Sequence, residues 1–173
     1  MNQIHEGGTL ICHIDAQMKV PAIHEVIQKC SVFSTLPDID LFKKAVIERE
    51  MIETTGIGHG IAIAHGKVPD LTSVKVGLGL SECGVEYDAK DGKPVHFLFV
   101  IASSPNKQFE YIRTLSTLLR TVRSAEVREE LLSLDELYKC DPFHRHGSTQ
   151  GDIAMRSFVS HYFSWLWKNE SKQ

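Results

Sequence analysis

Residues 54–67 read Thr-Thr-Gly-Ile-Gly-His-Gly-Ile-Ala-Ile-Ala-His-Gly-Lys, a glycine-rich loop followed by a short apolar segment and a second histidine. The alternating glycines leave backbone N–H groups unobstructed, and successive exposed amides can bind an oxyanion. If residues 61–64 are extended, His59 and His65 fall on one face, opposite small residues that allow close packing. His65 would then end a strand, where a side chain is held in place and remains reachable.

Arg49 precedes this loop at the end of a helix expected from about Asp38 to about Met51. The spacing of Phe42 and Val46 puts Arg49 on or beside the apolar stripe, where its planar fork of donors suits a phosphate or carboxylate. The alternative, that the guanidinium complements the end of its own helix, is the commoner role of such a charge. An arginine, exposed amides and a strand-end histidine within seventeen residues together favour an anion site.

Predicted strands and helices interleave along the rest of the chain. Expected strands cover residues 9–14, 74–81, 85–88 and 95–102, the last two joined by a hairpin turn at Asp91-Gly92. Expected helices begin at Pro21, at the cap Ser104 with Pro105, at Ser124 (ending near Leu132), at Ser133 and at Asp152 (running to Lys168). The pattern predicts an α/β fold with a mixed β-sheet flanked by helices and a C-terminal helical appendage. The expected domain spans residues 1–147, and the aromatic helix within 148–173 is expected to pack on it or at a subunit interface.

Composition is that of a soluble globular protein: 42% of the 173 residues are hydrophobic, 24% are charged, and the formal net charge is −3. The absence of a basic run argues against nucleic-acid binding. The lack of a secretory signal or of an apolar run of membrane-spanning length predicts a cytoplasmic protein without membrane insertion. Four scattered cysteines are expected to be reduced thiols: Cys12, Cys30, Cys83 and Cys140.

A possible metal cluster lies in Cys140, His144 and His146, but the C-x₃-H-x-H spacing without a fourth nearby ligand fits no common zinc pattern. We therefore expect no metal and no cofactor. The last predicted helix carries five aromatic residues and is interrupted by charged ones, which favours docking on its own domain or a second subunit over membrane contact.

The loop-to-histidine segment resembles the active-site signature of the enzyme IIA proteins of the fructose, mannitol and nitrogen-regulatory class. The preceding Glu-Arg-Glu at 48–50 and the segment 77–102 resemble the adjoining parts of that family, and the likeness extends over roughly residues 10–138. The resemblance implies that His65 accepts a phosphoryl group through Nε2 from the small phosphocarrier HPr or a paralogue. It also implies that Arg49 lies beside His65 and that an enzyme IIB or a regulatory target acts downstream. His59 is expected to support the site by hydrogen bonding.

The chain departs from the family pattern at two positions. Ala64 stands where a proline commonly precedes the phosphorylated histidine, and Tyr111 stands where the family often has a second histidine. The leading interpretation is a phosphocarrier of the regulatory, nitrogen-type branch, with a homodimer possible. The alternatives are a protein-binding regulator that is phosphorylated poorly or never, and a sugar-uptake enzyme IIA of the fructose or mannitol type.

Overall fold

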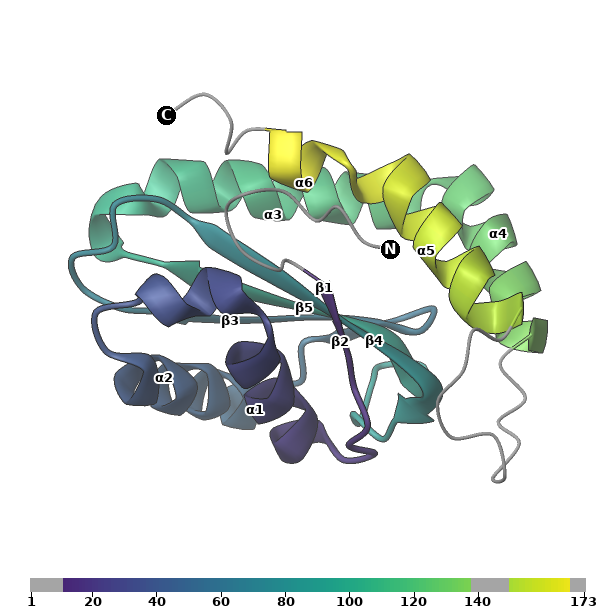
Figure 1. Cartoon of the computed structure of the whole chain (residues 1–173), viewed down its shortest axis with the longest axis horizontal. Helices are drawn as coiled ribbons and strands as arrows, with labels where there is room; N and C mark the ends of the chain where they lie inside the picture. The colour runs from purple at the N-terminus through teal and green to yellow at the C-terminus, as the bar shows by residue number, and fades with distance from the viewer. Residues whose placement is uncertain (1–10, 138–149, 169–173) are drawn as a thin grey trace. The chain divides into compact units, whose positions relative to one another are not determined.

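The computed structural model describes residues 11–137 and 150–168 (Figure 1). By their contacts the residues form two compact units, Met1–Leu115 and Ser116–Gln173. Among the described residues, no helix combines the length and the apolar character needed to cross a bilayer.

The first unit is built on a five-stranded sheet with the order β1-β4-β5-β3-β2. Its strands are β1 (Ile11–His13), β2 (Gly56–Gly58), β3 (Ile61–Lys67), β4 (Lys75–Val85) and β5 (Val95–Ser103). The β1–β4 and β3–β5 pairs are parallel, whereas β4–β5 and β2–β3 are antiparallel. The sheet is therefore mixed, and the predicted fold class is confirmed.

Strand β5 lies in the middle of the sheet, and all nine of its residues are buried. Its run of valine, phenylalanine, leucine and isoleucine suits a strand that exposes neither face to water. This strand forms the centre of the core and pairs directly with β3, which carries His65.

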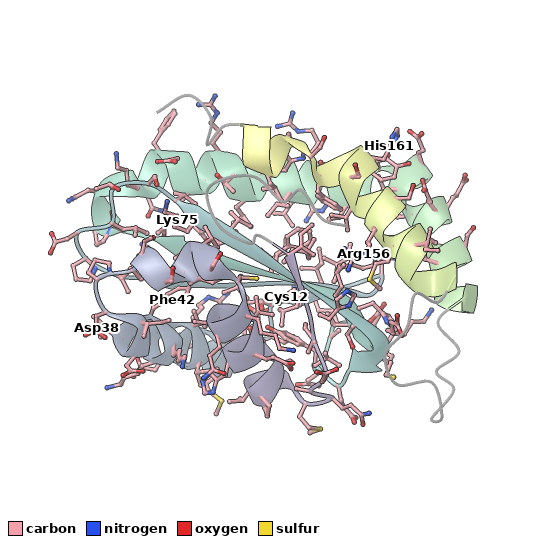
Figure 2. All side chains as sticks on the ribbon, viewed as in Figure 1. Cys12, Asp38, Phe42, Lys75, Arg156 and His161 are labelled. Atoms are coloured by element: carbon pink, nitrogen blue, oxygen red, sulfur yellow. The ribbon has the colours of Figure 1, made fainter. Side chains whose placement is uncertain are left out.

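Helices α1 (Lys19–Lys29) and α2 (Ile39–Ile52) lie on one face of this sheet, joined by the short helix η1 (Ser31–Thr35) (Figure 1). The side chain of Asp38 accepts a hydrogen bond of 2.9 Å from the backbone N–H of Leu41, which confirms the predicted cap. Phe42 is fully buried on the side of α2 that faces the sheet (Figure 2). This packing fixes α2 against the strand of the candidate site.

The hairpin expected around Asp91-Gly92 differs from the prediction in the strand that precedes the turn. Residues 85–88 do not form a strand of their own, because β4 continues from Lys75 to Val85 through a register shift between Leu80 and Val85. The turn itself is present: the N–H of Gly92 donates to the carbonyl of Ala89 over 2.9 Å, and Gly92 has a φ of 70°.

After β5 the chain forms η2 (Pro105–Lys107) and α3 (Gln108–Arg123), which crosses the division between the units. A helix begins after Ser104 as predicted, but the Ser104 side chain makes no cap. Its hydroxyl donates instead to the carbonyl of Leu71 over 3.2 Å.

The second unit contains α4 (Ala125–Leu137), α5 (Gln150–Phe163) and α6 (Trp165–Lys168), with α4 in contact with α5 (Figure 1). The expectation of two short helices separated at Ser133 is wrong. Ser133 lies within α4, and its hydroxyl donates to the carbonyl of Glu129 one turn earlier. Figure 2 shows Arg156 and His161 along α5, the first part of the predicted aromatic helix.

Cys12 and Cys30 are buried thiols that form no disulfide. Cys83 is disulfide-bonded, so the expectation of a reduced thiol is wrong there. The possible metal cluster at Cys140, His144 and His146 lies outside the described residues, as does the predicted boundary at residue 147.

Candidate functional site

His65 lies near the carboxyl end of β3, where it pairs with Ile101 of β5 and is partly exposed. Its Nδ1 is 3.2 Å from the carbonyl oxygen of Ile63. Because a carbonyl oxygen can only accept a hydrogen bond, Nδ1 must carry the hydrogen that makes this contact. In the neutral ring, Nε2 is then left with a free lone pair.

Burial is the main influence on the charge of His65, and it lowers the pKa of the imidazole below its ordinary value of 6.5. The Ile63 carbonyl and the Glu50 carboxylate raise this pKa, whereas the positive charges of Arg49 and Lys67 lower it. The net shift is downward. The ring is therefore neutral near pH 7, the form in which Nε2 is a nucleophile.

Gly66 explains how a helix comes so close to the histidine. A Cβ at this position would lie 2.8 Å from Cγ2 of Val46 and 2.9 Å from its backbone nitrogen. Only glycine therefore allows α2 to touch the main chain of β3 here. Arg49 is three residues beyond Val46, on the same side of the helix. Sequence reasoning used Gly66 only as the end of a motif and missed this packing role.

Of the two roles that the sequence left open for Arg49, the structure shows the helix-end contact. Its Nη1 donates to the carbonyl of Glu53 over 2.9 Å and so completes the C-terminal end of α2. Its positive charge also lowers the pKa of both His65 and Tyr111, so the guanidinium lies within electrostatic range of the two rings. The bond to the Glu53 carbonyl uses one nitrogen of the guanidinium group, and the other N–H groups can still donate to an anion.

Tyr111, in the first half of α3, lies beside the histidine. The centroids of the two rings are 5.7 Å apart, and the ring planes are inclined by 44°. Tyr111 is only 9% exposed, and this burial raises the pKa of its phenol, which stays neutral at physiological pH. The structure thus brings together His65, Arg49 and Tyr111.

His59 is in a different place, in the turn between β2 and β3. It is exposed and has a φ of 56°, and its backbone N–H donates to Oδ2 of Asp91 over 2.9 Å. His65 is four residues along β3 from Ile61, so about 13 Å of strand separates the turn from the histidine. The structure therefore brings neither His59 nor the amide of His59 to His65.

Glu50 is a buried residue of the site region to which sequence reasoning gave no role. Its carboxylate accepts hydrogen bonds from the backbone and the hydroxyl of Thr55 and from the hydroxyl of Tyr87, and it pairs with Lys19. The only signal in the sequence was its place beside Arg49 at a helix end. A charged residue there is ordinarily solvated, so the burial could not be foreseen.

Comparison with solved structures defines the class of fold. The chain superposes on the nitrogen regulatory protein IIA-Ntr of Neisseria meningitidis with a TM-score of 0.63 and 23% identity, over 86% of this chain and 91% of that one. It also superposes on the structure of the complex of enzyme IIA-mannitol with phosphorylated enzyme IIB-mannitol of Escherichia coli, with a TM-score of 0.57 and 17% identity, over 86% and 94%. The fold is that of an enzyme IIA domain.

The family model of the phosphoenolpyruvate-dependent sugar phosphotransferase system, EIIA 2, matches residues 5–139, and the chain belongs to this family. It is 32% identical over 127 residues to the fructose-specific EIIABC component of Bacillus subtilis, covering 73% of this chain and 20% of that protein. It is 31% identical over 131 residues to the nitrogen regulatory protein of Escherichia coli K12, covering 70% and 80%. The chain thus spans a fifth of the length of the Bacillus relative. The resemblance drawn from the sequence is confirmed.

Proposed function

We propose that this chain is a phosphocarrier that accepts one phosphoryl group from a phosphohistidine of an HPr-like protein onto Nε2 of His65. The observation that carries the proposal is the hydrogen bond between Nδ1 of His65 and the Ile63 carbonyl, because it leaves Nε2 as the free nucleophile. The lowered pKa of the ring keeps that nitrogen unprotonated at neutral pH.

In the proposed step, the lone pair of Nε2 forms a bond to phosphorus while the bond from phosphorus to the donor's imidazole nitrogen breaks. The donor nitrogen keeps the electron pair of the broken bond, and the proton on Nδ1 of His65 stays in place. Such a transfer passes through a loose transition state and depends on alignment and charge neutralisation. Arg49 would neutralise the phosphoryl oxygens, and the hydroxyl of Tyr111 would donate a hydrogen bond to one of them.

The regulatory, nitrogen-type branch is the proposed setting. It is supported by the relatives named nitrogen regulatory protein, one of which is matched over 80% of its length. The downstream partner would then be a regulatory target protein. In the alternative, fructose- or mannitol-type setting, it would be an enzyme IIB, as in the mannitol complex. Adding each candidate partner to the phosphorylated chain and following loss of the label separates the two settings.

A second candidate is a protein-binding regulator that keeps the fold without being phosphorylated. Tyr111 favours it, because a buried neutral phenol beside His65 brings no positive charge to a phosphoryl group. Ala64, where the family commonly has proline, is the other departure. The phosphorylation experiment below decides between the two candidates.

We further propose that the phosphocarrier domain covers residues 1–147 and that residues 148–173 form an appendage without a part in the transfer. The buried side chains of α5 support a structural role for this segment. Removing residues 152–173 should lower solubility or change the oligomeric state, homodimer or monomer, and should leave His65 able to accept phosphate.

The central test is incubation with phosphoenolpyruvate, enzyme I and HPr, followed by measurement of the intact mass. We expect one added phosphoryl group, labile in acid and stable in alkali, that is absent from His65→Ala. His59→Ala is the matched control: it removes the other histidine of the same segment, which lies in the turn before β3 and away from His65, so labelling should persist. Labelling that persists in His65→Ala would refute the proposal.

A further inference from the structure

The carboxylate of Glu50 is 5% exposed and is held on every side by polar partners. The backbone N–H of Thr55 donates to Oε1 over 2.9 Å, and the Thr55 hydroxyl donates to Oε2. The hydroxyl of Tyr87 also donates to Oε2, over 3.1 Å, and Nζ of Lys19 lies 3.3 Å from Oε1. A buried carboxylate requires such compensation, and here it comes from three different parts of the first unit.

Two further hydrogen bonds extend this network to His65. The backbone N–H of Ile63 donates to the carbonyl of Thr55 over 3.1 Å, and the carbonyl of Ile63 accepts from Nδ1 of His65 over 3.2 Å. Thr55 lies between the end of α2 and the start of β2, outside both elements, so beyond the bond to Ile63 its main chain needs support from a side chain. The Glu50 carboxylate supplies that support, by binding both the N–H and the hydroxyl of Thr55.

We propose that Glu50 is a positioning residue for His65: through Thr55 and the main chain of Ile63, its buried carboxylate fixes the orientation and the tautomer of the imidazole. The consequence for phosphoryl transfer rests on the function proposed above, whereas the effect on the ring stands on the contacts alone. A buried ion pair is often no better for stability than an apolar group of the same shape, which also points to a role in geometry.

The electrostatics of the site agree with this role. Glu50 raises the pKa of His65, and its neighbour Arg49 lowers it, so two consecutive residues of α2 act on the ring in opposite directions. Lys67 on β3 lowers the same pKa, and the Tyr111 phenol on α3 is neutral. Removing the charge of Glu50 should therefore lower the pKa of His65 further.

The test uses the full chain before phosphorylation, with the ring nitrogens of His65 followed by ¹⁵N NMR through a pH titration. In the wild type we expect the Nδ1-protonated tautomer to predominate. In Glu50→Gln we expect a mixture of tautomers and a lower pKa, together with phosphoryl acceptance slowed about tenfold, the scale for losing a residue that orients another. Glu48→Gln is the control, because Glu48 is on the same helix and its side chain is 67% exposed.

A second pair of variants covers the case in which Glu50→Gln does not fold. Thr55→Val removes the hydroxyl that binds Glu50 at nearly constant shape, whereas Thr55→Ser keeps it. We expect the tautomer mixture and the slower acceptance in the valine variant, and values near those of the wild type in the serine variant. A wild-type tautomer and pKa in folded Glu50→Gln, or a wild-type tautomer in Thr55→Val, would overturn the inference. Failure of the wild type to accept phosphate on His65 would instead refute the proposed function and leave the NMR result standing.

Discussion

Gly66 on β3 and Val46 on α2 are in contact main chain to main chain. A Cβ on Gly66 would lie 2.9 Å from the backbone nitrogen of Val46 and 3.3 Å from the carbonyl carbon of Ala45. A backbone cannot move aside as a flexible side chain can, so the approach of the helix to the strand depends on the missing side chain.

Gly66→Ala should therefore destabilise the protein by about 1–3 kcal/mol, the usual cost of inserting a methyl group into a packed site. It should also move Arg49 away from His65 and slow phosphoryl acceptance. Urea unfolding measures the first effect. Gly92→Asn is the control, since no atom lies within 4 Å of a Cβ there and asparagine tolerates its positive φ. Equal stability of Gly66→Ala and the wild type would show that α2 can withdraw without cost.

Arg49→Met should slow phosphoryl acceptance by roughly ten- to a thousandfold, the range for losing one fixed donor that stabilises developing charge. It should also cost about 1 kcal/mol of stability through the lost hydrogen bond to Glu53. The two readouts separate the two roles of Arg49. Lys44→Met is the control, because Lys44 is on the same helix with its side chain 71% exposed. A normal rate with reduced stability would leave Arg49 a helix-end residue only.

Tyr111→Phe should slow acceptance or shorten the life of the phosphorylated form, because it removes the one hydroxyl that this ring offers beside His65. Tyr111→His should do the opposite, since a partly protonated imidazole stabilises a dianionic phosphoryl group better than a neutral phenol does. Rates of transfer and of hydrolysis of the phosphorylated form, measured for both variants, test the pair. If both match the wild type, Tyr111 only packs against the histidine.

The lowered pKa of His65 should make stability fall in acid. Above about pH 6.5 the ring is neutral in both the folded and the unfolded chain, so it has no effect on stability. As the pH falls below that value, the unfolded chain binds a proton before the folded chain does, which favours unfolding. His65→Gln should remove this contribution. The free energy of unfolding of the variant minus that of the wild type should therefore rise as the pH is lowered from 7.5 to 5. A difference that does not change with pH would contradict the lowered pKa of His65.

Phe158 tests the structural role of the C-terminal helix. Its side chain is 1% exposed within α5, so Phe158→Ala should cost about 3–5 kcal/mol. Ile153→Ala, at a position of the same helix that is 61% exposed, should change stability by less than about 0.5 kcal/mol. Thermal unfolding of the full chain compares the two. A melting temperature unchanged by Phe158→Ala would make the helix a dispensable tail.

The sequence predicted those elements whose structure depends on residues close together in the chain. The apolar run of β5 and the Asp38 cap of α2 were foreseen because burial and capping act within a few residues. The continuity of α4 through Ser133 was not foreseen, because a serine hydroxyl that caps a new helix can equally bind the carbonyl one turn back in an existing one.

Within the site, the placement of His65 at the end of a strand was predicted, and its separation from His59 was not. Side chains alternate between the two faces only where the backbone is extended. The left-handed conformations of Gly58, His59 and Gly60 interrupt the extended backbone before β3 begins, so His59 and His65 do not share a face. The network around Glu50 joins α1, α2 and the segment before β5, which no local pattern connects.

The contact between α2 and β3 also bears on how the protein would respond to heat. Because the two main chains touch, thermal motion of side chains cannot lengthen the distance between the element that carries Arg49 and the one that carries His65. We expect the two elements to separate only when the packing of the first unit is lost. The final extent of phosphorylation should therefore stay nearly constant on warming and then disappear within the same few degrees as the native circular-dichroism signal.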